Sequence, residues 1–140
     1  MILFCDSSAL VKLYVQEDGS DQMKLMAKRV KMVAAARITY AEAMAALSRR
    51  GRESPADGLS VGLAKQSLTA DWEKYVLVEI TQDLMVLAAD LAETLALRGY
   101  DSVQLAAART LQQSAGQVLR FACFDQRLSR AAGVLGMETL

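Results

Sequence analysis

The sequence predicts an α/β fold, with a mostly parallel central sheet flanked by helices on both faces. Two observations lead to this prediction. Short apolar runs alternate along the chain with longer segments in which apolar residues recur at helical spacing. The segments between these runs are long enough for the helical crossovers that parallel strands require. Because 140 residues is the size of one ordinary domain, we expect residues 1–140 to form a single domain.

The strand predictions rest on apolar or alternating runs that are too short for helices. The first run leads directly into an acidic residue, Asp6. The last run is expected to add an edge strand. In chain order, the predicted strands are Ile2–Cys5, Met32–Ala36, Tyr75–Ile80, Val118–Phe124 and Met137–Leu140.

The helix predictions rest on apolar stripes and on residues that favour helix ends. The run Arg49-Arg50-Gly51-Arg52 closes one helix, since helix C-termini favour basic residues and Gly. Ser54-Pro55 has the chemistry of a helix start. In chain order, we expect helices from about Ser7 to Tyr14, Asp21 to Lys31, Thr39 to Arg52, Ser54 to Glu73, Leu84 to Leu95, Asp101 to Gln113 and Asp125 to Ala132.

The composition excludes several classes of site. Lys and Arg together number 16, as do Asp and Glu, so no overall positive charge attracts nucleic acid. The chain has no His, which rules out Ser-His-Asp triads, Cys-His pairs and histidine-ligated zinc. Cys5 and Cys123 lie in apolar runs and fit buried thiols in a reducing compartment.

We expect a cytoplasmic protein without membrane attachment. The first residues have no basic flank and too short an apolar core for a signal peptide. The most apolar helical stretch, Leu84–Leu97, is interrupted by Asp90 and Glu93, which argues against a membrane span.

Four carboxylates lie at predicted helix starts: Asp6, Glu42, Asp101 and Asp125. Each has an ordinary structural explanation, because acids cap helix N-termini and offset the helix dipole. Glu42 follows Thr39 by three residues, which is the spacing of a capping box. Asp6, however, lies flush against a predicted buried strand, where a carboxylate without a partner is costly to desolvate.

Together, the four carboxylates point to a metal site. Asp6 and Asp125 directly follow predicted strands, and ligands of open α/β sheets bind outside the carboxyl ends of the strands. Carboxylates that share a pocket repel one another, and a hard cation such as Mg²⁺ or Mn²⁺ relieves that repulsion. A pocket of this kind suits phosphodiester hydrolysis by a metal-activated water.

At these residues the sequence resembles the PIN-domain ribonucleases, and among them the VapC-like toxins of toxin–antitoxin pairs. The likeness covers nearly the whole chain, in order and at family-like spacing. The matching stretches are Leu3-Phe-Cys-Asp6-Ser-Ser-Ala-Leu-Val-Lys-Leu-Tyr14, Ile38-Thr-Tyr-Ala-Glu42-Ala-Met-Ala-Ala-Leu47, Gly99-Tyr-Asp101-Ser-Val-Gln-Leu-Ala-Ala-Ala108, and Phe124-Asp125-Gln-Arg-Leu128 with Ala131-Ala132 behind it.

The resemblance implies a PIN-like nuclease domain in which Asp6, Glu42 and Asp101 bind metal and Asp125 completes or braces the site. It also implies Mg²⁺-dependent endoribonuclease activity on RNA, a homodimer, and neutralisation by a small antitoxin protein. Ser8 matches a position where relatives often have a hydroxyl near the metal, although a serine at a helix start needs no such role.

Several alternatives stay open at this point. Arg37 could reach a phosphate near the pocket. The basic run that includes Arg49, Arg50 and Arg52 could contact RNA, although solvation of a helix end explains it as well. The chain could also be a PIN-like scaffold that binds RNA or a protein without cutting, or a phosphatase or phospho-acceptor domain that uses Asp6.

The chain departs from the family pattern at two positions. Cys123 stands where relatives often have Thr or Ser, and Gln104 stands where many have His. The first departure bears on the orientation of Asp125, and we expect the second to change little.

Overall fold

The computed structural model describes residues 1–140 and contains one four-stranded parallel sheet. The strands lie in the order β3-β2-β1-β4, so β1 is central and β4 joins it from the other side. This order places a topological switch point between β1 and β4, where open α/β sheets bind ligands. The strands are β1 (Ile2–Cys5), β2 (Met32–Ala36), β3 (Val76–Val78) and β4 (Leu119–Ala122).

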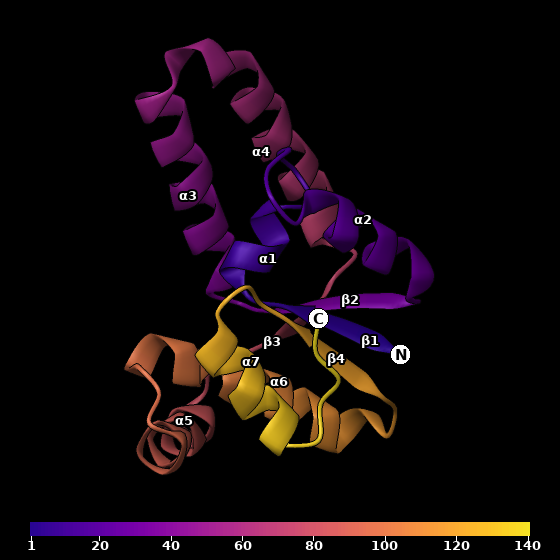
Figure 1. The fold of residues 1–140 in the computed structure, drawn as a ribbon, viewed down its shortest axis with the longest axis vertical. Coiled ribbons are helices and arrows are strands. Elements are labelled where there is room, and N and C mark those ends of the chain that lie inside the picture. The colour runs from indigo at the N-terminus through magenta and orange to yellow at the C-terminus, as the bar shows by residue number, and fades with distance from the viewer.

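Helices cover both faces of the sheet, as the sequence predicts. Figure 1 shows α1–α4 on one side of the sheet and α5–α7 on the other. No helix is long and apolar enough to cross a membrane. The helices are α1 (Ser7–Val11), α2 (Ser20–Arg29), α3 (Thr39–Glu53), α4 (Gly58–Trp72), α5 (Gln82–Leu95), α6 (Gly99–Ala115) and α7 (Gln126–Val134).

Alternate residues of β1 belong to the two halves of the core. Ile2 and Phe4 pack with residues of α5–α7, while Leu3 and Cys5 pack with residues of α1–α4. The Phe4 ring stacks on that of Phe121 in β4, with ring centroids 5.6 Å apart. Burial of each large apolar side chain contributes about 1.5–3 kcal/mol. The strand that leads into the first acidic residue is therefore firmly held.

The structure corrects three predicted elements. The predicted helix from Ser54 instead begins with a 3₁₀ turn, Pro55–Asp57, and α4 starts at Gly58. The predicted strand Val118–Phe124 ends at Ala122, because the chain then turns toward the cap of α7. The predicted strand Met137–Leu140 is a single bridge, because only the backbone of Glu138 pairs with β4.

Candidate active site

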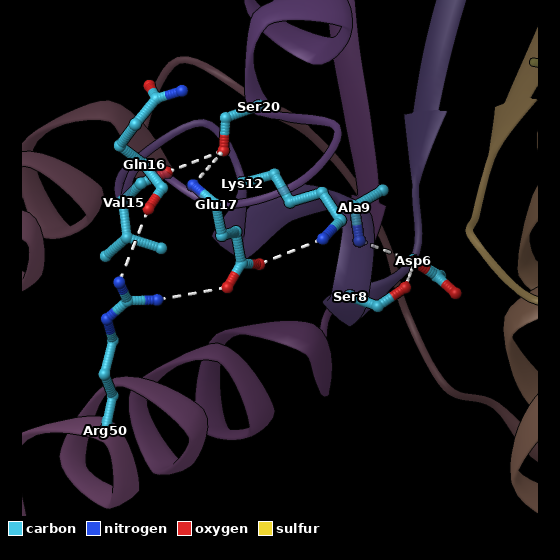
Figure 2. A network of polar contacts seen from close by, with 9 residues as sticks. All are labelled: Asp6, Ser8, Ala9, Lys12, Val15, Gln16, Glu17, Ser20 and Arg50. Atoms are coloured by element: carbon cyan, nitrogen blue, oxygen red, sulfur yellow. Dashed lines mark hydrogen bonds and ion pairs between the residues drawn. The ribbon is translucent and has the colours of Figure 1, made fainter.

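Asp6 is fixed at the carboxyl end of the central strand. Its backbone N–H donates to the carbonyl of Ala122 at 3.1 Å, which ties it to β4. Its Oδ1 caps α1 by accepting from the N–H of Ala9 at 2.9 Å, and it also accepts from the Ser8 hydroxyl at 2.8 Å (Figure 2). Only 8% of Asp6 is exposed. Ser8 therefore orients this carboxylate from within α1.

The capping-box interpretation of Glu42 is wrong. The N-cap of α3 is Ile38, without a side-chain cap, so Thr39 is already the first helical residue. The buried Thr39 hydroxyl accepts from the Gln104 side chain of α6 at 3.0 Å instead of capping α3. Glu42 Oε1 likewise accepts from Gln104 Nε2, at 3.2 Å. Glu42 is thus held by another helix, and local capping does not explain it.

Asp101 and Asp125 both form an ion pair with Arg98, an arginine that the sequence patterns did not indicate. Arg98 is the N-cap residue of α6, so Asp101 is the third residue of that helix and does not cap it. Arg98 Nε lies 3.3 Å from Asp101 Oδ2, and Arg98 Nη2 lies 3.4 Å from Asp125 Oδ2. Asp125 caps α7 as predicted, with its Oδ1 accepting from the N–H of Leu128 at 3.0 Å. In the sequence, the only indication that Arg98 contacts Asp101 is that it precedes Asp101 by one helical turn.

The carboxylates of Asp6, Glu42 and Asp101 form one electrostatic cluster. Burial raises the pKa of Asp6, hydrogen bonds from Ala9 and Ser8 oppose that rise, and the nearby Asp101 charge adds to it. Burial also raises the pKa of Glu42, and the charges of Asp6 and Asp101 raise it further. The pKa of Asp125 is lowered, mainly by hydrogen bonds from backbone N–H groups. The charges of Arg98 and Arg127 lower it further.

We expect Asp6 to reduce the stability of the metal-free protein at neutral pH. A carboxyl whose folded pKa exceeds its unfolded value binds more protons when folded, so its destabilising effect is full above the folded pKa and fades below the unfolded value, about 4. In urea unfolding, Asp6→Asn should be more stable than wild type at about pH 7, and the gap should shrink at about pH 4. A gap that does not change with pH would contradict this. Glu79 and Asp125 have lowered pKa values, which make the opposite contribution to stability, but both residues are present in both proteins, so their contribution cancels in the comparison.

The cluster has oxygen donors that suit a hard divalent cation, but in this structure the side chains are too far apart to bind one ion together. All its ligating atoms are carboxylate oxygens, which suits Mg²⁺ or Mn²⁺. In this structure, however, no three acidic or thiol side chains lie close enough to hold one ion together. Asp101 is turned toward Arg98. An ion would have to draw Asp101 and Glu42 toward the fixed Asp6.

A groove of about 520 Å³ opens beside the cluster, between α1 and α3. One end is lined by Ser7, Ser8 and Glu42, and the other by Arg49 and Arg50. Glu42 and Arg49 are seven residues apart on α3, which is about 10 Å along the helix axis. The groove therefore leads from the acidic cluster to basic side chains.

Ion pairs hold the wall of this groove opposite α3. Lys12 and Arg50 both bind the Glu17 carboxylate, at 3.0 and 3.1 Å (Figure 2). Arg50 is thereby committed to Glu17, whereas Arg49 contacts only Glu53, one turn away on the same helix. Arg49 is the basic residue of the groove most available to a ligand.

Two other predicted or noted residues lie away from the cluster. Arg37 forms an ion pair with Glu79 at the end of β3 and contacts none of the four acids. Cys123 is buried, and its thiol donates to the backbone carbonyl of Asp125 at 3.4 Å. Cys123 thus supports the cap of α7, where a hydroxyl of similar position would do the same.

Comparison with known proteins identifies the family of the chain. Two proteins of Mycobacterium tuberculosis, Ribonuclease VapC45 (strain CDC 1551 / Oshkosh) and Ribonuclease VapC49 (strain ATCC 25618 / H37Rv), are each 30% identical to it over 135 residues. The match covers 96% of this chain and 92% of each relative. The chain belongs to the VapC ribonuclease family. No family model matches the chain.

Solved structures share the fold of this VapC-family chain at low sequence identity. A toxin–antitoxin complex from Klebsiella pneumoniae contains a chain with a TM-score of 0.63 and 18% identity, covering 89% of this chain and 87% of that one. VapBC2 from Rickettsia felis, bound to a DNA fragment from its promoter, gives 0.65 and 12%, covering 100% and 98%. A protein from Pyrobaculum aerophilum gives 0.68 and 20%, covering 99% and 89%. These likenesses confirm the predicted α/β fold.

Proposed function

We propose that this VapC-family chain is a metal-dependent endoribonuclease whose metal is held by Asp6, Glu42 and Asp101. One observation carries the assignment: three carboxylates from separate segments lie near the carboxyl end of the sheet, where the Asp101 charge raises the pKa of Asp6 and the charges of Asp6 and Asp101 raise the pKa of Glu42. Mg²⁺ or Mn²⁺ is the expected ion, because the donors are all oxygens. When bound, such an ion polarises the phosphate and lowers the pKa of a bound water.

The remaining residues of the site prepare these carboxylates. Ser8 and the N–H of Ala9 fix Asp6, and Gln104 restrains Glu42. Arg98 holds Asp101 and Asp125 together, so it neutralises part of the acidic charge when no ion is bound. We assign Asp125 a bracing role on that account, because its Oδ1 caps α7 while its Oδ2 pairs with Arg98.

We propose that the substrate is single-stranded RNA lying in the groove between α1 and α3. Arg49 is the side chain we expect to bind a phosphate there, while the equally basic Arg52 does not line the groove. In an Asp6→Asn background, which keeps the RNA intact, Arg49→Gln should weaken RNA binding. A plot of the logarithm of the binding constant against the logarithm of salt concentration should become less steep by about 0.7, the contribution of one phosphate contact on a single strand.

Arg52→Gln is the matched control for this prediction, since it removes the same charge from the same helix outside the groove. RNA binding measured by fluorescence anisotropy over a range of salt concentrations distinguishes the two variants. Equal salt slopes for Arg49→Gln and Arg52→Gln would show that the RNA does not follow this groove.

We also propose a small antitoxin protein as the partner of this chain. The family membership supports it, and structural neighbours include toxin–antitoxin complexes. A homodimer, a cytoplasmic location and one nuclease domain over residues 1–140 stay predictions. Co-purification of the chain with a small protein encoded beside it tests the partnership.

The proposed activity is tested by incubating the purified chain with RNA in Mg²⁺, in Mn²⁺ and in EDTA. We expect cleavage with either ion and none in EDTA. One observation favours a second candidate, a PIN-like scaffold that binds RNA or a protein without cutting: no three acids are gathered as a ready metal site. Absence of cleavage, with no binding of millimolar Mn²⁺, would favour the scaffold. Turnover of a generic phosphomonoester would instead indicate a phosphatase.

A further inference from the structure

Gln104 connects the two helices that carry Glu42 and Asp101. It lies one turn after Asp101 on α6, and 1% of it is exposed. Its Nε2 donates to Thr39 Oγ1 at 3.0 Å and to Glu42 Oε1 at 3.2 Å. Residues three apart on a helix share a face, so α6 presents Asp101 and the amide that contacts Glu42 on the same side.

The amide of Gln104 is oriented by the carboxylate it contacts. With the amide reversed, its Oε1 would face Glu42 Oε1, and two oxygens that only accept would repel. In the observed orientation both Nε2 hydrogens are used, but the buried Oε1 has no hydrogen-bond partner. An unpaired buried acceptor destabilises a protein, so Gln104 is not the residue that stability alone would favour here.

We propose that Gln104 is a positioning residue of the metal site, which holds the Glu42 carboxylate by an amide hydrogen bond on the side of the cluster facing Asp6 and Asp101. The inference rests on the proposed function, since it assigns Glu42 to the metal. Carboxylates that bind metals are commonly oriented by a hydrogen bond from a second residue, and removal of that partner weakens metal binding by about 10- to 100-fold.

A merely structural link between α3 and α6 would give a different result in a matched set of variants. Gln104→Met keeps the length of the side chain and removes both the donor and the unpaired acceptor. Gln104→His restores a nitrogen donor at the same position. Gln113→Met makes the same chemical change at an exposed position of α6 and serves as the control.

The experiment titrates Mn²⁺ alone into each variant by calorimetry and measures metal-free thermal unfolding and RNA cleavage in parallel. We expect Gln104→Met to stay folded at the assay temperature, to bind Mn²⁺ about 10- to 100-fold more weakly, and to regain cleavage as Mn²⁺ is raised. Gln104→His should recover most of the affinity, and Gln113→Met should match wild type.

Two results would overturn the proposal. One is unchanged Mn²⁺ affinity in Gln104→Met; the other is a Gln104→Met chain that no longer folds, because the amide would then serve the fold. The outcome also separates this inference from the proposed function. If wild type binds no Mn²⁺ and cuts no RNA, the metal-dependent nuclease is wrong; if wild type does both and Gln104→Met equals it, only the role of Gln104 is wrong.

Discussion

Replacing Asp6 with Asn is expected to reduce RNA cleavage by about a thousandfold while the protein stays folded. The loss follows from removing one carboxylate of the proposed metal site, which supplies several kcal/mol of transition-state stabilisation; a thousandfold loss corresponds to about 4 kcal/mol. The fold should survive because Asn keeps the oxygen that accepts from Ala9 and Ser8. Single-turnover cleavage of a labelled RNA in Mg²⁺ measures the effect.

The stability of Asp6→Asn makes this prediction specific. Without metal, the variant should be more stable than wild type at neutral pH, because burial of the Asp6 charge is unfavourable. Asp90→Asn, on the exposed surface of α5, removes the same charge at a distance and should leave cleavage unchanged. Cleavage by Asp6→Asn at the wild-type rate would refute a catalytic role for the cluster.

Asp101→Asn is expected to reduce cleavage by a similar factor, and the double variant with Asp6→Asn should be little worse than either single one. When two residues act as a unit, removing either one abolishes the contribution of both, so the losses in transition-state stabilisation from the two substitutions do not add. If Asp6 and Asp101 bind the same ion, the first substitution already empties the site. Rates of the two single variants and the double variant form the required cycle.

Two losses that multiply in the double variant would mean that Asp6 and Asp101 act independently, so a shared ion would be excluded. Asp125→Asn is a useful comparison, since Asp125 pairs with Arg98 and the side-chain oxygen of Asn can still cap α7. We expect its loss of activity to be smaller than that of Asp101→Asn.

The four strands of the sheet and the place of Asp6 could be predicted from the sequence because they depend on short-range patterns. A run of four buried apolar residues followed by an acid is readable without the rest of the chain. The cap at Asp125 is local in the same way. These features place two acids at one edge of a parallel sheet, and the structure has both there.

Contacts between distant segments could not be predicted in the same way. The Thr39–Glu42 spacing fits a capping box, yet Thr39 pairs with Gln104, 65 residues away. We expected Gln104 to change little, but it contacts Glu42 directly. Arg98 lies 27 residues from Asp125 and becomes its partner only when α6 and α7 are placed. These contacts depend on how the helices pack against one another, which the spacing of residues along the sequence does not indicate.

The most direct test of the shared metal site is a Mn²⁺ titration of wild type, Asp6→Asn, Glu42→Gln and Asp101→Asn, followed by calorimetry. The three carboxylates are proposed to bind one ion together, so each substitution alone should abolish binding or weaken it by at least about tenfold, the effect of losing even an outer partner of a metal ligand. Wild type should bind Mn²⁺ saturably. Unchanged Mn²⁺ binding in all three variants would contradict the account.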